Sequence, residues 1–248
     1  LMHLCKHGDA GKFQKEFKES LHLLKYVNTP DAVGWTALMW ATCKNQTDIV
    51  EELLKLEQID VNATDEHGTT ALMIASGREC CRIQRALLSH PCLEVNQLSA
   101  AGETALMIAA AHDHPDVVRQ FVDRKDVSIN SSNGKTALMK ASESNQPRVV
   151  RELLEHPQID VNLPTSNGGT ALMIAAENNY VDVVKSLLCH RHVDVNHTNR
   201  IGRTALHLAS VQGNLSVVAE LLGHETIEIN ATDDEGCTPL ILAAHSNF

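Results

Sequence analysis

Aromatic residues are scarce in this chain of 248 residues. Phe, Trp and Tyr together make up 3% of it, whereas 43% of the residues are hydrophobic. A core with so few rings has to be built from aliphatic side chains and alanine, which suits short helices packed closely together. No apolar run reaches 18 residues and no signal peptide is visible, so the sequence predicts no insertion into a membrane.

Positive charge is also in short supply. The chain has 21 Lys and Arg residues against 31 Asp and Glu, which gives a formal net charge of −10. Proteins that bind nucleic acids usually carry a basic surface, and anionic membranes attract basic segments. The charge balance therefore argues against a nucleic-acid partner and against a membrane surface.

Cys-x-x-Cys spacing is absent, and the seven cysteines are odd in number. This predicts reduced thiols, as in a cytoplasmic or nuclear protein, rather than a disulfide framework. The pairs His112/His114 and His190/His192 are conceivable metal ligands, but no set of carboxylates or cysteines completes a zinc site. We therefore predict no metal and no cofactor.

Motifs of catalysis are missing as well. The sequence has no Gly-rich phosphate loop, no Gly-x-Ser-x-Gly and no His-Glu-x-x-His. We predict that this segment is not an enzyme. Because the chain begins at Leu1 and ends inside an unfinished repeat, we expect it to be a fragment, and a catalytic domain outside it is compatible with the sequence.

What the chain does have is a repeat, Gly-x-Thr-Ala-Leu. The spacing is 34 residues at every step except one of 32, between Gly102 and Gly134. A period of this length predicts a stack of small units, none of which buries its apolar face alone. The repeats begin at Gly34, Gly68, Gly102, Gly134, Gly168 and Gly202, with a Thr-Pro-Leu variant at Gly236.

Each unit reads as helix, turn, helix and extended segment. In one copy, Thr136 is placed to cap a first helix and Asn145 to form a turn with left-handed backbone. Pro147 then starts a second helix, whose residues 149–154 have the spacing of a buried helical stripe. An alternating segment, 159–162, leads to the next glycine.

These motifs resemble the ankyrin repeat in order, spacing and residue type. The resemblance implies an all-α fold, a solenoid of stacked helix-turn-helix units with extended β-hairpin-like fingers. It covers residues 1–248 as a single domain. Residues 1–28 form a degenerate first repeat, six full repeats start near 31, 65, 99, 131, 165 and 199, and a partial repeat spans 233–248.

The resemblance also implies a non-catalytic module that binds a peptide or domain of another protein, on a concave face of fingers and first helices. Basic residues on that face favour a partner with acidic character. Trp35 and Trp40 are the only tryptophans and are either interface anchors or fillers beside the first repeat. The candidate partner-binding residues are Trp35, Trp40, Lys44, Ile74, Arg78, Ile108, His112, Lys135, Lys140, Ile174, Asn178 and Arg203.

An alternative function is a nucleotide or small-ligand sensing domain of a larger regulatory protein. A tryptophan would stack on the ligand, and Lys44 or Arg78 would contact phosphate.

A modification is also suggested by similarity, because Leu154 and Asn162 have the spacing of the motif that asparaginyl hydroxylases modify in ankyrin domains. A side chain that stabilises the finger turn explains the same asparagines without an enzyme. The candidate hydroxylation sites are Asn62, Asn96, Asn162, Asn196 and Asn230.

Three departures from the family pattern lead to further expectations. His90, His156, His190 and His224 recur near the end of the second helix, where a cationic side chain would interact favourably with the helix dipole, and we expect capping or loop histidines there. Methionine replaces the usual histidine after Thr-Ala-Leu in five repeats, which predicts apolar packing, with an adaptable binding strip as the alternative. The short step predicts a shortened finger at 130–134.

Overall fold

The computed structural model describes Cys5, residues 25–130 and residues 134–246. The chain divides into two compact units. Unit 1 comprises residues 1–109 and 124–127, and unit 2 comprises residues 110–123 and 128–248. Most of the degenerate first repeat and the tip of the shortened finger, at 131–133, lie outside the described residues.

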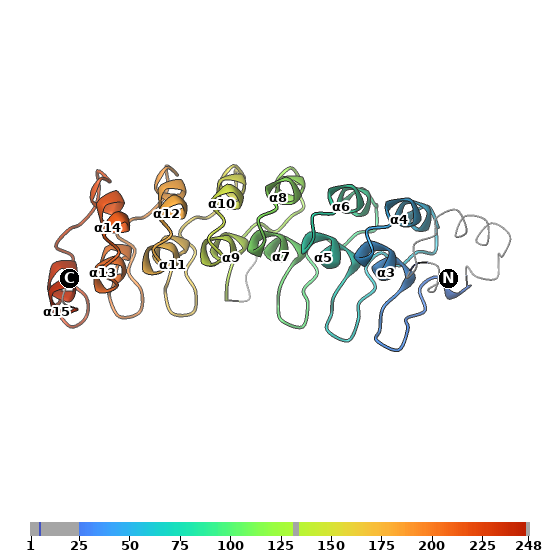
Figure 1. The fold of residues 1–248 in the computed structure, drawn as a ribbon, viewed down its shortest axis with the longest axis horizontal. Helices are drawn as coiled ribbons and strands as arrows, with labels where there is room; N and C mark the ends of the chain where they lie inside the picture. Colours follow the sequence, from blue (N-terminus) through green and yellow to red (C-terminus); the bar gives the residue numbers. More distant parts are fainter. Residues whose placement is uncertain (1–4, 6–24, 131–133, 247–248) are drawn as a thin grey trace. The chain divides into compact units, whose positions relative to one another are not determined.

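Helices α3 to α14 follow one another in pairs, and α15 is the first helix of the last repeat (Figure 1). No strand occurs in the ranges that the structure describes. Unit 1 contains α3 (Ala37–Cys43), α4 (Thr47–Leu54), α5 (Ala71–Ser76) and α6 (Cys81–Leu88), and the boundary between the units falls inside α7 (Ala105–Ala111). Unit 2 contains α8 (Pro115–Val122), α9 (Ala137–Glu143), α10 (Pro147–Leu154), α11 (Ala171–Glu177), α12 (Val181–Leu188), α13 (Ala205–Val211), α14 (Leu215–Leu222) and α15 (Pro239–His245).

First helices pack on first helices within each unit, and second helices on second helices. In unit 1, α3 contacts α5 and α4 contacts α6; in unit 2, α9, α11, α13 and α15 form one row and α8, α10, α12 and α14 the other. The predicted helix pairs are therefore confirmed. Among the described residues, no helix is long and apolar enough to cross a bilayer.

Local sequence signals set the helix ends as predicted. The hydroxyl of Thr136 accepts the backbone N–H of Met139 at the start of α9, and Pro147 occupies the first turn of α10. Asn145 has a φ of 54°, in the left-handed region that asparagine tolerates. Similar signals recur in the neighbouring repeats, so the helices begin and end at equivalent positions, except that α5 ends one residue earlier.

The core is aliphatic and rich in alanine. Ala137, Leu138 and Ala141 of α9 and Val149 and Leu153 of α10 are all at most 1% exposed. The predicted packing role of methionine is confirmed, since Met39, Met73, Met107, Met139 and Met173 are at most 2% exposed. They are part of the core and do not form a binding strip.

Candidate partner-binding surface

One row of side chains per unit lies where the sequence predicts an open inner surface. In α3, α5, α7, α9, α11 and α13 the fourth residue of the helix is half-exposed, and the residue ten positions after the repeat glycine is exposed. In unit 1 these are Trp40 and Lys44, Ile74 and Arg78, and the half-exposed Ile108; in unit 2 they are the exposed His112, Lys140 and Ser144, Ile174 and Asn178, and Leu208 and Gln212. We call this row the inner surface of each unit.

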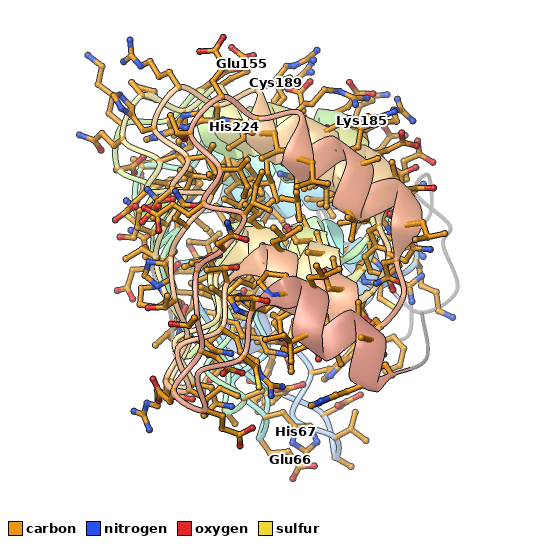
Figure 2. The ribbon with its side chains drawn as sticks, turned by 90° about the vertical axis from the view of Figure 1, so that its left-hand side faces the viewer. Glu66, His67, Glu155, Lys185, Cys189 and His224 are labelled. Carbon is orange, nitrogen blue, oxygen red and sulfur yellow. The ribbon has the colours of Figure 1, made fainter. Side chains whose placement is uncertain are left out.

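The finger next to the inner surface is closed by a repeated turn. In the finger at 65–69, Asp65 Oδ1 accepts the N–H groups of His67 and Thr69, and the Asp65 N–H donates to Thr69 O. Gly68 completes the turn with a φ of 70°. The finger tip, with Glu66 and His67, projects away from the helices of unit 1 (Figure 2). The turn places the residue after each repeat glycine between the finger and the first helix.

In the repeat of unit 1 that begins at Gly34, that position holds Trp35, which forms a pair with Trp40. The ring centroids are 4.8 Å apart with the planes tilted by 55°, and both side chains are half-exposed. Each indole is fixed through its N–H, Trp35 Nε1 to Asp65 Oδ2 at 3.1 Å and Trp40 Nε1 to Asp31 Oδ2 at 2.9 Å. Two rings held in this way present a rigid aromatic surface, which is the kind of group that anchors interfaces.

The carboxylate that receives the Trp35 indole remains ionised. Burial raises the pKa of Asp65, but the hydrogen bonds from Thr69, His67 and Trp35 outweigh burial, and the net effect lowers its pKa. The indole is a neutral donor, so this hydrogen bond does not cancel the charge of the carboxylate.

Beside the tryptophans, unit 1 exposes two cations. Lys44 and Arg78 follow α3 and α5 at equivalent positions, and both are exposed. Among the residues that the structure describes, neither has an ion pair. Their charges are therefore directed to solvent, where an acidic group of a partner could approach.

Unit 2 uses its cations differently. Lys135 Nζ contacts both carboxylate oxygens of Glu143, at 2.6 and 2.8 Å, and Arg203 Nε donates to Asp233 Oδ2 at 3.0 Å. The hydrogen bonds from Cys237 N–H, above all, together with Arg203 and Glu235 N–H, lower the pKa of Asp233. Both predicted binding residues, Lys135 and Arg203, thus hold parts of the protein's own structure.

The remaining predicted residues in unit 2 have varied surroundings. The exposed ring of His112 stacks near His114, with centroids 5.9 Å apart, and Asn178 donates to the carbonyl of Ile174 in its own helix. Lys140 and Ile174 are half-exposed. In the part of unit 2 that the structure describes, these positions have no aromatic pair like Trp35 and Trp40.

The finger asparagines connect successive repeats. Asn162 Nδ2 donates to His192 O at 2.7 Å, and its Oδ1 accepts the N–H of Asp194 at 2.8 Å. The carboxamide thus bridges to the next repeat, instead of stabilising its own turn as the sequence suggested. The donor half of this bridge recurs at Asn28, Asn62, Asn96, Asn130 and Asn196. Hydroxylation of these asparagines stays a prediction.

The recurring histidines are loop residues that hold the turn after the second helix. His190 Nδ1 accepts the backbone N–H of His192 at 3.4 Å, and the same contact occurs at His90, His156 and His224. Burial and the neighbouring His192 and Arg191 lower the pKa of His190, which favours its neutral form. His207 Nδ1 accepts the N–H of Thr204 at 3.1 Å, and burial lowers its pKa.

Sequence reasoning missed the acidic residues that hold the surface, namely Asp31, Asp65, Glu143 and Asp233. A signal was present for three of them. Asp31, Asp65 and Asp233 each precede a repeat glycine by three residues, and Ser99, Thr165 and Asn199 occupy the same place. Short polar side chains at a fixed distance before glycine are typical of such turns.

Comparison with known proteins identifies the family. A model of ankyrin repeats in three copies matches residues 1–97, 83–165, 106–199 and 172–248. A search of curated proteins found no match.

Solved structures with the same fold include the ankyrin repeat domain of Bcl-3, described as a unique member of the IkappaB protein family. It is 26% identical with a TM-score of 0.77, over 85% of this chain and 94% of that one. The ankyrin repeat protein EF0377 is also 26% identical, with a TM-score of 0.71 over 78% of this chain and 98% of its own. The helix pairs, the finger turns and these matches agree, and the chain belongs to the ankyrin repeat family.

Proposed function

We propose that this protein is a non-catalytic interaction module that binds a segment of another protein on the inner surface of unit 1. The observation that carries the proposal is the Trp35–Trp40 pair, two half-exposed rings fixed at 4.8 Å beside the exposed cations Lys44 and Arg78. The family supports the class of function, because ankyrin repeats generally act as protein-binding modules.

The arrangement favours a particular partner chemistry. Rigid aromatic groups contribute most when an apolar side chain covers them and excludes water. Lys44 and Arg78 would meet an acidic residue on either side of that apolar anchor, and such charge pairs mainly raise the association rate and the specificity. We therefore propose a partner segment with an apolar anchor and acidic flanks.

A small-ligand function has less support. The structure has cavities of about 450 and 370 Å³ at the second helices α10 and α12 and the segments that follow them, and one of about 410 Å³ lined by residues 93–97 and Asp126. None of these three is lined by Trp35, Trp40, Lys44 or Arg78.

The proposal is tested by affinity capture with immobilised protein from a lysate of cells that express it. Trp40→Ala should lose a specific captured protein, identified by mass spectrometry, with binding weakened more than about tenfold. Leu215→Ala is the matched control, because Leu215 is also a large apolar residue, 76% exposed, but lies on α14 of unit 2. Equal capture by wild type, Trp40→Ala and Leu215→Ala would remove the tryptophan pair from the binding surface.

A further inference from the structure

Ion pairs link the second helices of unit 2 in a regular pattern. The fifth residue of one helix pairs with the sixth residue of the next. Arg119 of α8 binds Glu152 of α10 through two nitrogens, one at 2.9 Å, and Lys185 of α12 contacts Glu220 of α14 at 3.4 Å. A base on one helix thus faces a glutamate on the next.

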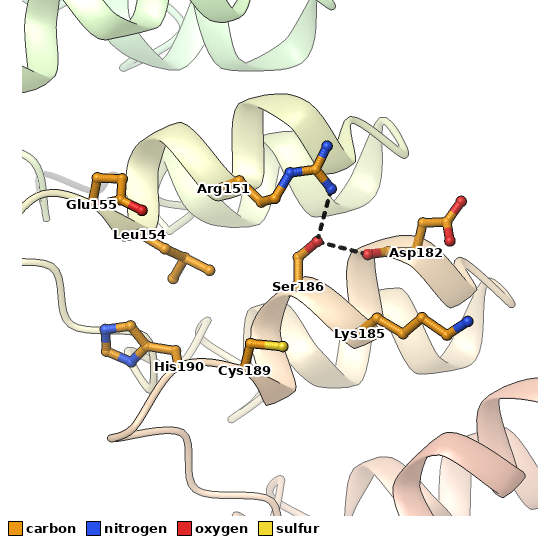
Figure 3. Close-up of a pocket in the computed structure, with 8 residues that line it drawn as sticks. All are labelled: Arg151, Leu154, Glu155, Asp182, Lys185, Ser186, Cys189 and His190. Carbon is orange, nitrogen blue, oxygen red and sulfur yellow. Dashed lines mark hydrogen bonds between the residues drawn. The ribbon is translucent and has the colours of Figure 1, made fainter.

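Between α10 and α12 this pattern lacks its acid. Arg151 of α10 occupies the position of Arg119 and Lys185, but Ser186 of α12 occupies the position of the glutamates. Arg151 Nη1 and Ser186 Oγ are 3.5 Å apart, a weak contact, and the Ser186 hydroxyl donates its hydrogen to Asp182 O at 2.8 Å (Figure 3). Arg151 has no ion pair with any residue that the structure describes.

A pocket opens where the acid is missing. Its volume is about 450 Å³, and Arg151, Leu154, Ser186, Cys189 and His190 are among the residues that line it. Figure 3 shows the guanidinium next to the Ser186 hydroxyl, and the less polar Leu154 and Cys189 are among the other side chains that line the pocket. Cys189 and Lys185 project on the second-helix side of unit 2 (Figure 2), so the pocket opens on that side and not on the inner surface.

The other charged groups of the pocket leave Arg151 as its central positive charge. Lys185 reaches toward Glu220, and the carboxylate of Asp182 points away from the guanidinium (Figure 3). Glu155 lies at the opposite end of the pocket, one helical turn after Arg151. His190 accepts a backbone N–H at Nδ1, so its Nε2 carries the ring hydrogen and is a further donor.

We propose that this pocket binds a glutamate side chain of a partner protein, which takes the place that Glu152 and Glu220 occupy in the flanking helix pairs. The carboxylate accepts two hydrogen bonds from the Arg151 guanidinium, a geometry that fits the planar fork of arginine. An apolar residue next to that glutamate packs on Leu154 and Cys189. This site is separate from the inner surface of unit 1, and it neither needs nor supports the proposal made for that surface.

The probe is the blocked tripeptide acetyl-Leu-Glu-Leu-amide, with acetyl-Leu-Gln-Leu-amide as its uncharged match. Titration into the ¹⁵N-labelled chain is followed by NMR through the Arg151 Nε–H signal and the backbone signals of α10 and α12. We expect saturable shifts with the Glu peptide, half-complete below about 10 mM at low salt. The Gln peptide should bind at least tenfold more weakly, because it lacks the charge that the guanidinium attracts.

Three variants locate the site. Ser186→Glu supplies the missing acid from within the chain, so it should weaken peptide binding at least tenfold while leaving α12 folded. Arg151→Gln should have the same effect on binding. Arg119→Gln is the matched control, since Arg119 already has Glu152 as partner, and it should leave peptide binding unchanged.

Three results would each overturn the proposal. The first is the absence of saturable shifts at Arg151 with the Glu peptide. The second is equal binding of the Glu and Gln peptides, and the third is binding that Ser186→Glu does not weaken. Circular dichroism of each variant shows that the helices are intact, so a loss of binding is not a loss of fold.

Discussion

The two units make the same inter-repeat bond with different side chains. In unit 1, Trp35 donates its indole N–H to Asp65; in unit 2, Arg203 donates its guanidinium N–H to Asp233, and both pairs are 30 residues apart. The indole leaves an aromatic surface and the exposed Lys44 and Arg78 beside it. The guanidinium instead neutralises the carboxylate. The same scaffold therefore leaves an open aromatic surface in unit 1, where we propose that a partner binds, and uses Lys135 and Arg203 for internal contacts in unit 2.

The most direct test exchanges the two donors, with arginine at position 35 and tryptophan at position 203. We expect this exchange to have the largest effect on partner binding. Trp35→Arg can still donate to Asp65, so the fold should persist, but the aromatic pair is lost. Binding of the partner captured by the wild type should fall more than about tenfold. Arg203→Trp should leave that binding unchanged. Isothermal titration of the purified partner measures both variants, and a strong loss in Arg203→Trp alone would reverse the assignment of the two units.

The contact between neighbouring fingers should have the next largest effect, which is on the free energy of unfolding. Gly168 has a φ of 79°, and a Cβ at this position would lie 2.9 Å from Arg200 N and 2.9 Å from Asn199 Cα of the next finger. Gly168→Ala should therefore destabilise unit 2 by about 3 kcal/mol, from backbone strain and from the clash. Urea denaturation followed by circular dichroism measures the change.

Gly236 is the matched control, because it has a similar φ of 77° but no atom within 4 Å of a built Cβ. Gly236→Ala should cost about 1 kcal/mol, from strain alone. If the two variants were equally stable, the contact between neighbouring fingers would contribute nothing.

The asparagine bridges should contribute equally to the stability of the two units. Equal contributions would show that the units differ in their surfaces and not in the scaffold beneath. Asn62→Ala in unit 1 and Asn162→Ala in unit 2 each remove a donor to the next repeat and an acceptor for a backbone N–H. Each should cost about 2 kcal/mol in urea denaturation. Asn230 is exposed and is followed only by the unfinished repeat, so it should tolerate alanine within about 0.5 kcal/mol. A much larger cost in one unit would mean that the scaffolds differ too.

The sequence was sufficient for the fold because the signals that set it are local and repeated. Thr136, Asn145 and Pro147 act within one turn of their own position, so their roles follow from residue type alone. Even the exposure of the inner surface could be predicted, since residues four apart share one face of a helix.

The charges of the candidate site were less predictable from the sequence, because ion pairs formed in the folded chain decide which cations stay exposed. Nothing in the sequence near Lys135 or Arg203 shows that Glu143 and Asp233 neutralise them, since those contacts depend on how a finger lies against a helix. The histidine turns were predictable as loop positions, but their hydrogen bonds were not. At His190 the dipole argument treats the ring as a cation, whereas burial and the backbone N–H of His192 favour its neutral form.

Acid should weaken unit 2 through these histidines, which we expect to be the smallest of the effects. Burial, together with His192 and Arg191, lowers the pKa of His190 from its ordinary value of 6.5, and burial lowers the pKa of His207. The folded state therefore resists protonation more than the unfolded chain does. The stability from these rings is complete above pH 6.5 and is lost as the pH falls through the lowered pKa values.

Thermal melts should show a midpoint several degrees lower at pH 5 than at pH 7.5. Asp65 and Asp233, whose pKa values are lowered from 3.8, keep their charge throughout this range and contribute only to losses in stronger acid. His190→Asn removes the titrating group but keeps a side-chain oxygen that can accept the N–H of His192. This variant should flatten the pH dependence. An unchanged pH profile would show that the histidine turns near the helix ends of unit 2 are not what acid disrupts.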